Sequence, residues 1–360
     1  MKRYYSLLML FGLLALTGCK KDPQEIFNEQ KSGVVLICNE FYYDITLPDG
    51  ENLYFSGIDD DGSLENLTNN REEIRQKPNV LNGTGFFIDR TGRILTNRHV
   101  VAPQVDKATV RNNINAILQG YAIYIDQLQD SLNQRYAEIQ SYAEQSTYQN
   151  YDGETYSTMS DYDIATLQQE VDRLRQQYDD AQSIKNYLMS NILSDNFSIQ
   201  LHSRFGIAYD GSSVDKWDDF MRTPCDLLRV SDDANSDLAL LQLHTRFTPA
   251  DRYIYSVEDM KATLDDDLKI NQTVYMIGYN HGVALAKTDN GIRAQFTSGT
   301  ITQQPDGKRI TYSIPAMPGS SGSPIVDDRG RLIAVNFAGS SGSDNFNFGI
   351  PLMRILTFLK

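Results

Sequence analysis

The chain has 360 residues, of which 33 are Lys or Arg and 47 are Asp or Glu, so its formal net charge at pH 7 is −14. A surface this acidic repels phosphate backbones, and because no basic cluster offsets the repulsion, the composition excludes nucleic acid as a partner. The length allows two or three domains.

The N-terminus has the layout of a secretory signal peptide. Lys2 and Arg3 precede an apolar run over 7–16, which is too short for a membrane-spanning helix of about 20 residues. The segment LTGC (16–19) resembles the bacterial lipobox, in which the cysteine is lipidated and becomes the first residue of the mature protein. We therefore expect a lipoprotein that begins at Cys19, is held to a membrane by acyl chains and lies in the cell envelope, facing the periplasm or the cell surface. An ordinary signal peptide with a chance cysteine is the alternative.

The signal peptide is expected to end at residue 18, and the next segment is polar. Residues 20–32 lack periodicity, so we interpret 19–32 as the lipidated cysteine and a tether. From residue 33 to 110, short apolar runs broken by Gly, Asp and Asn predict strands and hairpins. One such hairpin joins FFI to ILT through the turn DRTG (89–92).

Two long segments, 112–147 and 161–193, carry apolar residues at alternating spacings of four and three, which is typical of paired helices. The stripes consist of Ile114, Leu118, Tyr121, Ile125, Leu128, Leu132, Ile139 and Tyr142, and of Ile164, Leu167, Val171, Leu174, Tyr178, Ala181, Leu188 and Ile192. Ser160 and Asp163 predict a capping box at the second helix. We expect residues 111–196 to form an antiparallel coiled-coil hairpin in which each helix covers the other's stripe.

Strand patterns resume over 197–243 and again over 273–351, and the last residues, LMRILTFLK, have a helical pattern. The sequence therefore predicts a mainly β protein of two halves with a helical insertion in the first half. Cys38 and Cys225 follow Cys19, and outside the cytoplasm they are either paired or two separately buried thiols.

The segment MPGSSGSPIV (317–326) places three serines in a glycine-containing turn directly before an apolar strand. A serine hydroxyl is a poor nucleophile at pH 7 unless a base lies beside it, usually a histidine oriented by a carboxylate. The chain has four histidines: His99, His202, His244 and His281. His99 follows the strand ILTN, so its side chain projects from a rigid element.

Several motifs occur in the order found in one enzyme family. They are GTGFF (83–87), ILTNRHVV (94–101), SDLALL (236–241), TSGTIT (297–302) and PGSSGSPIV (318–326). Together they resemble the trypsin-like serine proteases, and the closest branch is the bacterial HtrA/Deg type. The resemblance covers 33–110 and 197–360, whereas the helical segment has no counterpart in the family. It implies a chymotrypsin-like or trypsin-like double β-barrel with the active site between the barrels.

The resemblance also assigns roles to individual residues. It makes His99 the general base, Asp237 the carboxylate that orients it and Ser321 the nucleophile. The backbone N–H groups of Gly319 and Ser321 would form the oxyanion hole, and no cofactor is implied. The aspartates at 232–233 are rivals for the carboxylate. The apolar strand after Asp237 favours that residue, since it would carry the carboxylate into the interior, where it needs a partner.

The sequence departs from the family pattern in three places. Ser320 occupies the position at which proteases activated by clipping have an aspartate, so we expect no activation of that kind. Pro315 stands where trypsin has the acidic residue that selects Arg and Lys. The substrate pocket, predicted to consist of Pro315, Met317, Asn336, Phe337 and Ala338, should therefore favour small or medium aliphatic side chains. Finally, the sequence ends nine residues after Pro351, so we expect no PDZ domain of the HtrA/Deg type.

Two functions follow from these observations. The first is a serine endopeptidase that hydrolyses proteins outside the cytoplasm. The second is a catalytically silent surface lipoprotein that has kept the protease fold and binds partners through residues 111–196. We expect this segment to dock a protein partner or a second copy of the chain, or to shade the active-site cleft; a passive stalk is the alternative.

Overall fold

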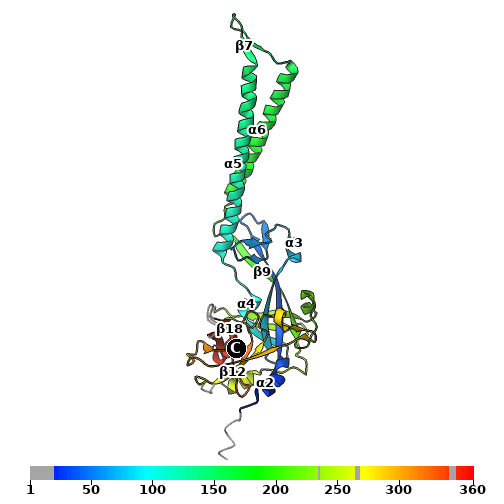
Figure 1. Cartoon of the computed structure of the whole chain (residues 1–360), viewed down its shortest axis with the longest axis vertical. Coiled ribbons are helices and arrows are strands. Elements are labelled where there is room, and N and C mark those ends of the chain that lie inside the picture. The colour runs from blue at the N-terminus through cyan, green and yellow to red at the C-terminus, as the bar shows by residue number, and fades with distance from the viewer. Residues whose placement is uncertain (1–19, 234–235, 264–267, 340–345) are drawn as a thin grey trace, which may run out of the picture. The chain divides into compact units, whose positions relative to one another are not determined.

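The computed structural model describes residues 20–233, 236–263, 268–339 and 346–360 (Figure 1). The expected signal peptide and Cys19 lie outside these ranges. Among the described helices, none is both long and apolar enough to cross a membrane.

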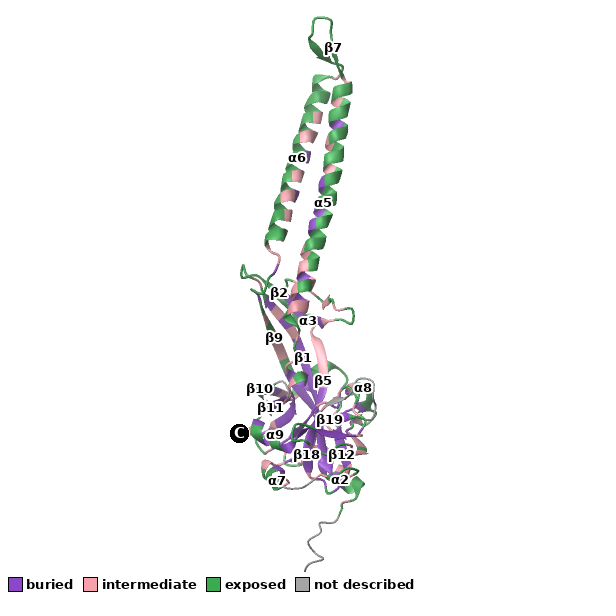
Figure 2. Cartoon of the chain, turned by 90° about the vertical axis from the view of Figure 1, so that its left-hand side faces the viewer, coloured by how far each residue is buried: buried purple, intermediate pink, exposed green. Residues whose placement is uncertain are grey.

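The chain divides into two compact units. The first consists of Met1–Tyr43, Arg71–Gln104 and Leu201–Lys360, and the second consists of Asp44–Asn70 and Val105–Gln200. This division differs from the expected boundaries, because residues 44–70 group with the helical segment and not with the β-rich part. Figure 2 shows buried residues concentrated in the strands of the first unit and exposed residues along most of the long helices.

The first sheet closes into a barrel. Its strands follow the order β2-β1-β5-β6-β11-β10-β9, and an additional pairing joins β9 to β1. The bounds are β1 (Val34–Thr46), β2 (Asn52–Phe55), β5 (Asn79–Phe87), β6 (Arg93–Asn97), β9 (Ser198–Tyr209), β10 (Pro224–Val230) and β11 (Leu238–Leu243). Apolar side chains such as Ile37, Ile94 and Leu241 fill one of its cores. The β6–β11 register sets Leu238 opposite Asn97, which brings the residues at the ends of these two strands together.

The second sheet has the order β15-β12-β17-β18-β19-β16, and an isolated bridge joins Ile301 to Tyr312. The bounds are β12 (Thr273–Gly278), β15 (Gln295–Thr300), β16 (Ile310–Tyr312), β17 (Pro324–Asp327), β18 (Leu332–Gly339) and β19 (Asn347–Pro351). One apolar cluster contains residues of both sheets, including Leu36, Phe86, Ile277 and Val335. The described strands thus form a closed six-stranded barrel and a half-barrel, and the predicted mainly β, double-barrel architecture is confirmed.

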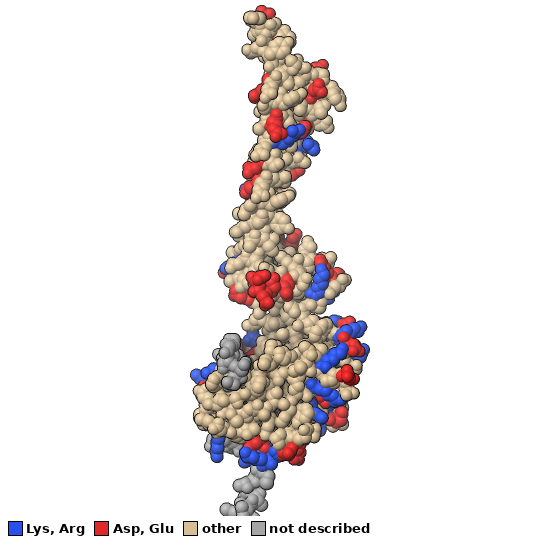
Figure 3. Space-filling view, in the orientation of Figure 1, with Lys and Arg blue, Asp and Glu red and all other residues tan. Residues whose placement is uncertain are grey.

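Short elements complete the described chain. They are α3 (Arg71–Gln76), α4 (Arg98–Val101), α7 (Val257–Ala262), α8 (Val283–Ala286), α9 (Leu352–Leu359), the 3₁₀ helix η2 (Trp217–Arg222) and the short strands β3 (Gly57–Ile58), β4 (Leu64–Glu65), β7 (Thr147–Gln149), β8 (Thr155–Ser157), β13 (Lys287–Thr288) and β14 (Gly291–Ile292). On the face shown in Figure 3, basic and acidic side chains of the first unit lie intermixed along one edge, and the centre of that face carries few of either.

The expected tether is instead a folded part of the first unit. Residues Pro23–Gln30 form helix α2, followed by the 3₁₀ helix η1 (Lys31–Gly33). The Asp22 side chain accepts hydrogen bonds from two backbone N–H groups of the first turn, and Pro23 is the first helical residue, as is common at helix starts. Ile26 is fully buried, and Gln30 donates from Nε2 to the carbonyl of Gly330 at 2.6 Å. The tether interpretation was wrong because this short helix is anchored by Ile26 and by Phe27, whose ring centroid lies 5.4 Å from that of Phe296, and two adjacent apolar residues leave no periodic pattern.

The second unit contains the two long helices, α5 (Lys107–Gln145) and α6 (Asp161–Ser190), which β7 and β8 connect. The predicted capping box is present at Ser160 and Asp163. Asn113 on α5 donates from Nδ2 to the carbonyl of Gly62 at 2.8 Å, which ties segment 44–70 to the hairpin.

The contact between the two helices differs from the predicted stripes. On α5 the buried positions include Ile114, Ile125 and Ile139 as expected, but also Ala122 and Gln129. Tyr121, Leu128 and Tyr142 of α5 and Ile164 of α6 are exposed, against expectation. Each predicted stripe is therefore wider than the surface that the other helix covers.

Candidate active site

His99 and Asp237 meet where strands β6 and β11 lie side by side. His99 stands in α4, directly after β6, and Asp237 immediately precedes β11. The ring nitrogen Nδ1 of His99 lies 2.7 Å from Oδ2 of Asp237, and the backbone N–H of His99 donates to Oδ1 at 3.0 Å. Both carboxylate oxygens therefore fix the same histidine, one through its ring and the other through its backbone.

The backbone of Asp237 is held equally firmly. Its carbonyl accepts hydrogen bonds from the N–H of Arg98 at 3.1 Å and from Nδ2 of Asn97 at 2.9 Å. Its φ of +26° lies in a region that non-glycine residues rarely adopt, so these contacts stabilise a strained conformation. The Asp237 side chain is 15% exposed and the His99 side chain 45%, so the carboxylate is shielded while the ring remains open to solvent. Among the described residues, the second ring nitrogen of His99 has no hydrogen-bond partner.

The other candidate aspartates and histidines lie elsewhere. Asp233 pairs with Arg354 at 3.0 Å. His244 lies 2.9 Å from Asp226, but both side chains are exposed. His202 stacks on a tyrosine ring, with ring centroids 4.9 Å apart. Asp237 is the carboxylate that the structure places against His99.

Thr84 of β5 holds the turn that carries Ser321. Its backbone N–H donates to the carbonyl of Ser321 at 2.8 Å, and its hydroxyl donates to the carbonyl of Gly319 at 2.8 Å. The same hydroxyl accepts a hydrogen bond from the N–H of Tyr279 at 3.1 Å. Thr84 is fully buried, so a residue of the first barrel fixes a turn of the second from inside the protein. Sequence reasoning missed this residue, although it lies in the GTGFF motif.

The three serines of the turn differ in their surroundings. Ser320 is buried, and its hydroxyl donates to the carbonyl of Met317 at 2.7 Å. Ser323 is also buried, and among the described residues its hydroxyl has no hydrogen-bond partner. Ser321 is partly exposed, and no described residue hydrogen-bonds to its hydroxyl. Ser321 is therefore the serine whose hydroxyl solvent or a bound molecule can reach.

Asn336 of β18 also holds the turn that carries Ser321. It is buried, and its Nδ2 donates to the carbonyl of Ser320 at 3.0 Å, while its Oδ1 accepts from the hydroxyl of Tyr312 at 2.8 Å. Its amide is thus committed to internal hydrogen bonds, so Asn336 does not supply the apolar pocket wall that was expected of it.

The backbone N–H groups of Gly319 and Ser321 are available for a ligand. Neither has an acceptor among the described residues. The carbonyl of Pro318 accepts from the N–H of His281 at 2.6 Å, and because C=O and N–H point in opposite directions across a trans peptide bond, the Gly319 N–H points away from His281. Two such free N–H groups in one turn can stabilise a negatively charged oxygen.

Position 319 requires glycine for two reasons. Its φ is +92°, which disfavours any residue with a Cβ atom. In addition, a Cβ at this position would lie 2.4 Å from the nitrogen of Gly282 and 2.6 Å from the carbonyl oxygen of Tyr279. The turn therefore packs directly against the backbone of segment 279–282.

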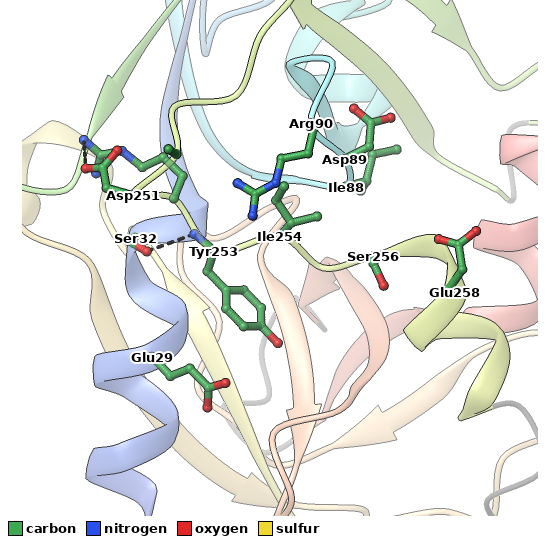
Figure 4. Close-up of a pocket in the computed structure, with 12 residues that line it drawn as sticks. Glu29, Ser32, Ile88, Asp89, Arg90, Asp251, Tyr253, Ile254, Ser256 and Glu258 are labelled. Carbon is green, nitrogen blue, oxygen red and sulfur yellow. Dashed lines mark hydrogen bonds and ion pairs between the residues drawn. The ribbon is translucent and has the colours of Figure 1, made fainter.

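The remaining predicted pocket residues differ in how far they are exposed. Pro315 and Met317 are exposed, and Phe337 is half-buried, with its ring centroid 6.4 Å from that of Phe348. The side chain of Ala338 lies outside the described residues. A separate hollow of about 660 Å³, into which Arg90 extends, contains none of the predicted site residues (Figure 4).

Cys38 and Cys225 are buried free thiols, which settles the alternative that the sequence left open. Burial raises the pKa of each thiol from 9.0 to about 12, so both are protonated at neutral pH and neither is a nucleophile. Within the described ranges, no three His, Cys, Asp or Glu side chains come together as a metal site.

Three comparisons with known proteins bear on the predicted resemblance. Residues 208–335 match the family described as trypsin-like peptidase domain. The Arabidopsis thaliana protein named Protease Do-like 5, chloroplastic, is 28% identical over 135 residues, which cover 34% of this chain and 38% of that protein. A serine endoprotease from Yersinia pestis matches with a TM-score of 0.44 and 11% identity, over 95% of this chain and 66% of that one. The chain thus spans well under half of the curated relative, and the family match confirms the resemblance.

Proposed function

We propose that this chain, in which residues 208–335 match the trypsin-like peptidase domain, is a serine endopeptidase that hydrolyses peptide bonds in proteins. The observation that carries this proposal is the His99–Asp237 pair, joined at 2.7 Å, in a unit that also presents the partly exposed Ser321 and two free backbone N–H groups.

In the proposed mechanism the hydroxyl of Ser321 attacks the carbonyl carbon of the scissile bond. His99 accepts the hydroxyl proton on Nε2 and then donates it to the leaving amine, after which water repeats the sequence to release the acid. Asp237 holds Nδ1–H of the ring, which leaves Nε2 as the basic nitrogen, and its negative charge stabilises the imidazolium. The N–H groups of Gly319 and Ser321 donate to the oxyanion of the tetrahedral intermediate, and each such donor contributes about 2.7–4 kcal/mol.

We also propose that the protein is lipidated on Cys19 and acts in the cell envelope on polypeptides outside the cytoplasm. The signal-peptide pattern and the segment LTGC support this location. The wild type should incorporate a radiolabelled fatty acid, whereas a Cys19→Ser variant should not. Equal incorporation by the two would refute the anchor and leave the proposed chemistry unaffected.

Labelling with a fluorophosphonate probe tests the catalytic proposal. The full chain with Cys19→Ser is compared with the same chain carrying Ser321→Ala or His99→Ala, and we expect labelling only with both residues intact. Ser323→Ala is the matched control for the serine, because its buried hydroxyl has no hydrogen bond to lose. His244→Ala is the control for the histidine, because it removes a surface pair of similar geometry.

The result that overturns the proposal is a folded wild type that does not label, or a Ser321→Ala variant that labels as fast as the wild type. Circular dichroism and urea unfolding establish that each protein is folded. The first outcome would favour the non-catalytic binding protein.

A further inference from the structure

Four large side chains form an exposed stripe on helix α5. Ile117, Tyr121, Tyr124 and Leu128 are 41%, 60%, 63% and 42% exposed. Their spacings of four, three and four residues place them along one face of the helix. We name these four residues and Gly120, which lies on the same face, the α5 stripe.

Helix α6 does not cover the α5 stripe. The buried residues of α5 include Ala122, Ile125 and Gln129, which lie on a different side of the helix from the stripe. Gln129 reaches α6 directly, since its Nε2 donates to Oε1 of Gln182 at 3.1 Å. The stripe therefore lies beside this contact, with four large apolar or aromatic side chains in water.

Gly120 is unexplained by the contacts within the chain. It lies in the middle of α5, where glycine is less favourable than alanine, yet a Cβ atom at this position would meet nothing within 4 Å. No turn or close packing inside the chain requires it. A gap between large side chains, however, admits a bulky side chain from a second helix.

The charge distribution favours a second copy of this chain as the occupant. Residues 112–125 contain no charged side chain, although the chain carries a net charge of −14. The next charged side chains of α5 follow from Asp126 onwards, for example Arg135, which pairs with Glu170 of α6 at 3.1 Å. In Figure 3 the charged side chains likewise leave a stretch of the hairpin without either colour. Two acidic copies can approach each other at such a neutral surface without repulsion.

We propose that two copies of this chain associate through the α5 stripe, with α5 of one copy packed on α5 of the other about a two-fold axis. Each stripe then meets an identical stripe, and an aromatic ring of each copy fills the space above Gly120 of the other. The stripe exposes on the order of 500 Å² per copy, so a dimer would bury about 1,000 Å², which is at the lower end of specific interfaces. The proposal does not depend on the proposed protease activity.

Sedimentation velocity of residues 20–360, which include both compact units without the signal peptide, tests the proposal over a range of concentrations. We expect a reversible dimer, and we expect Tyr121→Glu with Tyr124→Glu to weaken it at least 100-fold by placing four carboxylates in the interface. Tyr162→Glu is the matched control, because this tyrosine lies on α6 and is 79% exposed. Gly120→Leu should weaken the dimer while raising the thermal midpoint of the hairpin.

Disulfide cross-linking gives an independent readout, because both described cysteines are buried. Tyr124→Cys should form a cross-linked dimer on mild oxidation, whereas Gln119→Cys, which lies on another face of α5, should not. A monomeric wild type at the highest attainable concentration would overturn the proposal. A dimer that survives both glutamates, or cross-links equally through either cysteine, would also overturn it.

Discussion

Replacing Gly319 by alanine should damage both the stability of the protein and the rate of its proposed reaction. Two separate physical effects act on this residue. The φ of +92° costs about 1–2 kcal/mol once a Cβ is present. The Cβ also meets the nitrogen of Gly282 at 2.4 Å, which forces the turn to move and adds about 1–3 kcal/mol as overpacking does elsewhere.

A second glycine separates these two effects. Gly307 belongs to the same unit and has a φ of +76°, but a Cβ there would have nothing within 4 Å. Gly307→Ala should therefore lower the free energy of unfolding by about 1–2 kcal/mol through backbone strain alone. Gly319→Ala should lower it by about 2–5 kcal/mol, since strain and overpacking add.

The rate effect should be confined to Gly319→Ala. A displaced turn moves one oxyanion donor away from its position, which typically reduces kcat about 10²–10³-fold. Urea unfolding measures the stability difference, and the rate constant of fluorophosphonate labelling measures the reactivity of Ser321. If the two alanine variants unfold and label alike, the close packing of Gly319 on segment 279–282 does not position the site, and the reasoning is refuted.

Three further predictions concern Thr84, Asp237 and the two buried cysteines. Thr84→Val should slow labelling about tenfold and lower the free energy of unfolding by about 1–3 kcal/mol, because the N–H of Tyr279 and the carbonyl of Gly319 lose their hydrogen-bond partner. Thr84→Ser keeps the hydroxyl and should restore both the rate and the stability. If it does not, the loss is due to packing. Asp237→Asn should slow labelling roughly 10³–10⁴-fold with little loss of stability, because His99 loses the carboxylate that orients its ring. An unchanged labelling rate would exclude Asp237 as the orienting residue. Burial raises the pKa of the Cys38 and Cys225 thiols to about 12, above the 9.0 of an exposed thiol, so their contribution to stability is complete below pH 9 and is lost as the pH rises towards 12. The urea midpoint of the wild type should fall over that range, and it should fall less when either cysteine is replaced by alanine.

The sequence was sufficient for features that depend on local pattern. Short apolar runs between Gly, Asp and Asn predicted the strands of both barrels, because a half-buried strand needs apolar residues at short intervals. The alternating four- and three-residue spacing predicted the long helices, and the order of the motifs pointed to the family that matches residues 208–335. The assignment of His99, Asp237 and Ser321 to catalysis stays a prediction that the labelling experiment tests.

Short and irregular anchors needed the tertiary structure. Helix α2 has one fully buried apolar residue, Ile26, and therefore no period that a sequence pattern could show. The predicted helix stripes included Tyr121 and Leu128, which carry the right residue types at the right spacing. Only the observed contact between α5 and α6 shows that both side chains are left in water.

Contacts between residues that are far apart in the sequence also could not be predicted from it. Thr84 and Gly319 are 235 residues apart in the sequence. Ser320 and Asn336 are polar residues that no sequence pattern marks as hydrogen-bond partners. Their hydrogen bonds exist only because the two barrels pack together and remove these groups from water, where each must find an internal partner. Local sequence patterns thus predicted the helices and strands, and the order of the motifs suggested the candidate catalytic residues. Only the packing of the barrels decided which side chains hold Ser321 and the two N–H groups beside it, because a buried polar group is satisfied by its neighbours in space and not by its neighbours along the chain.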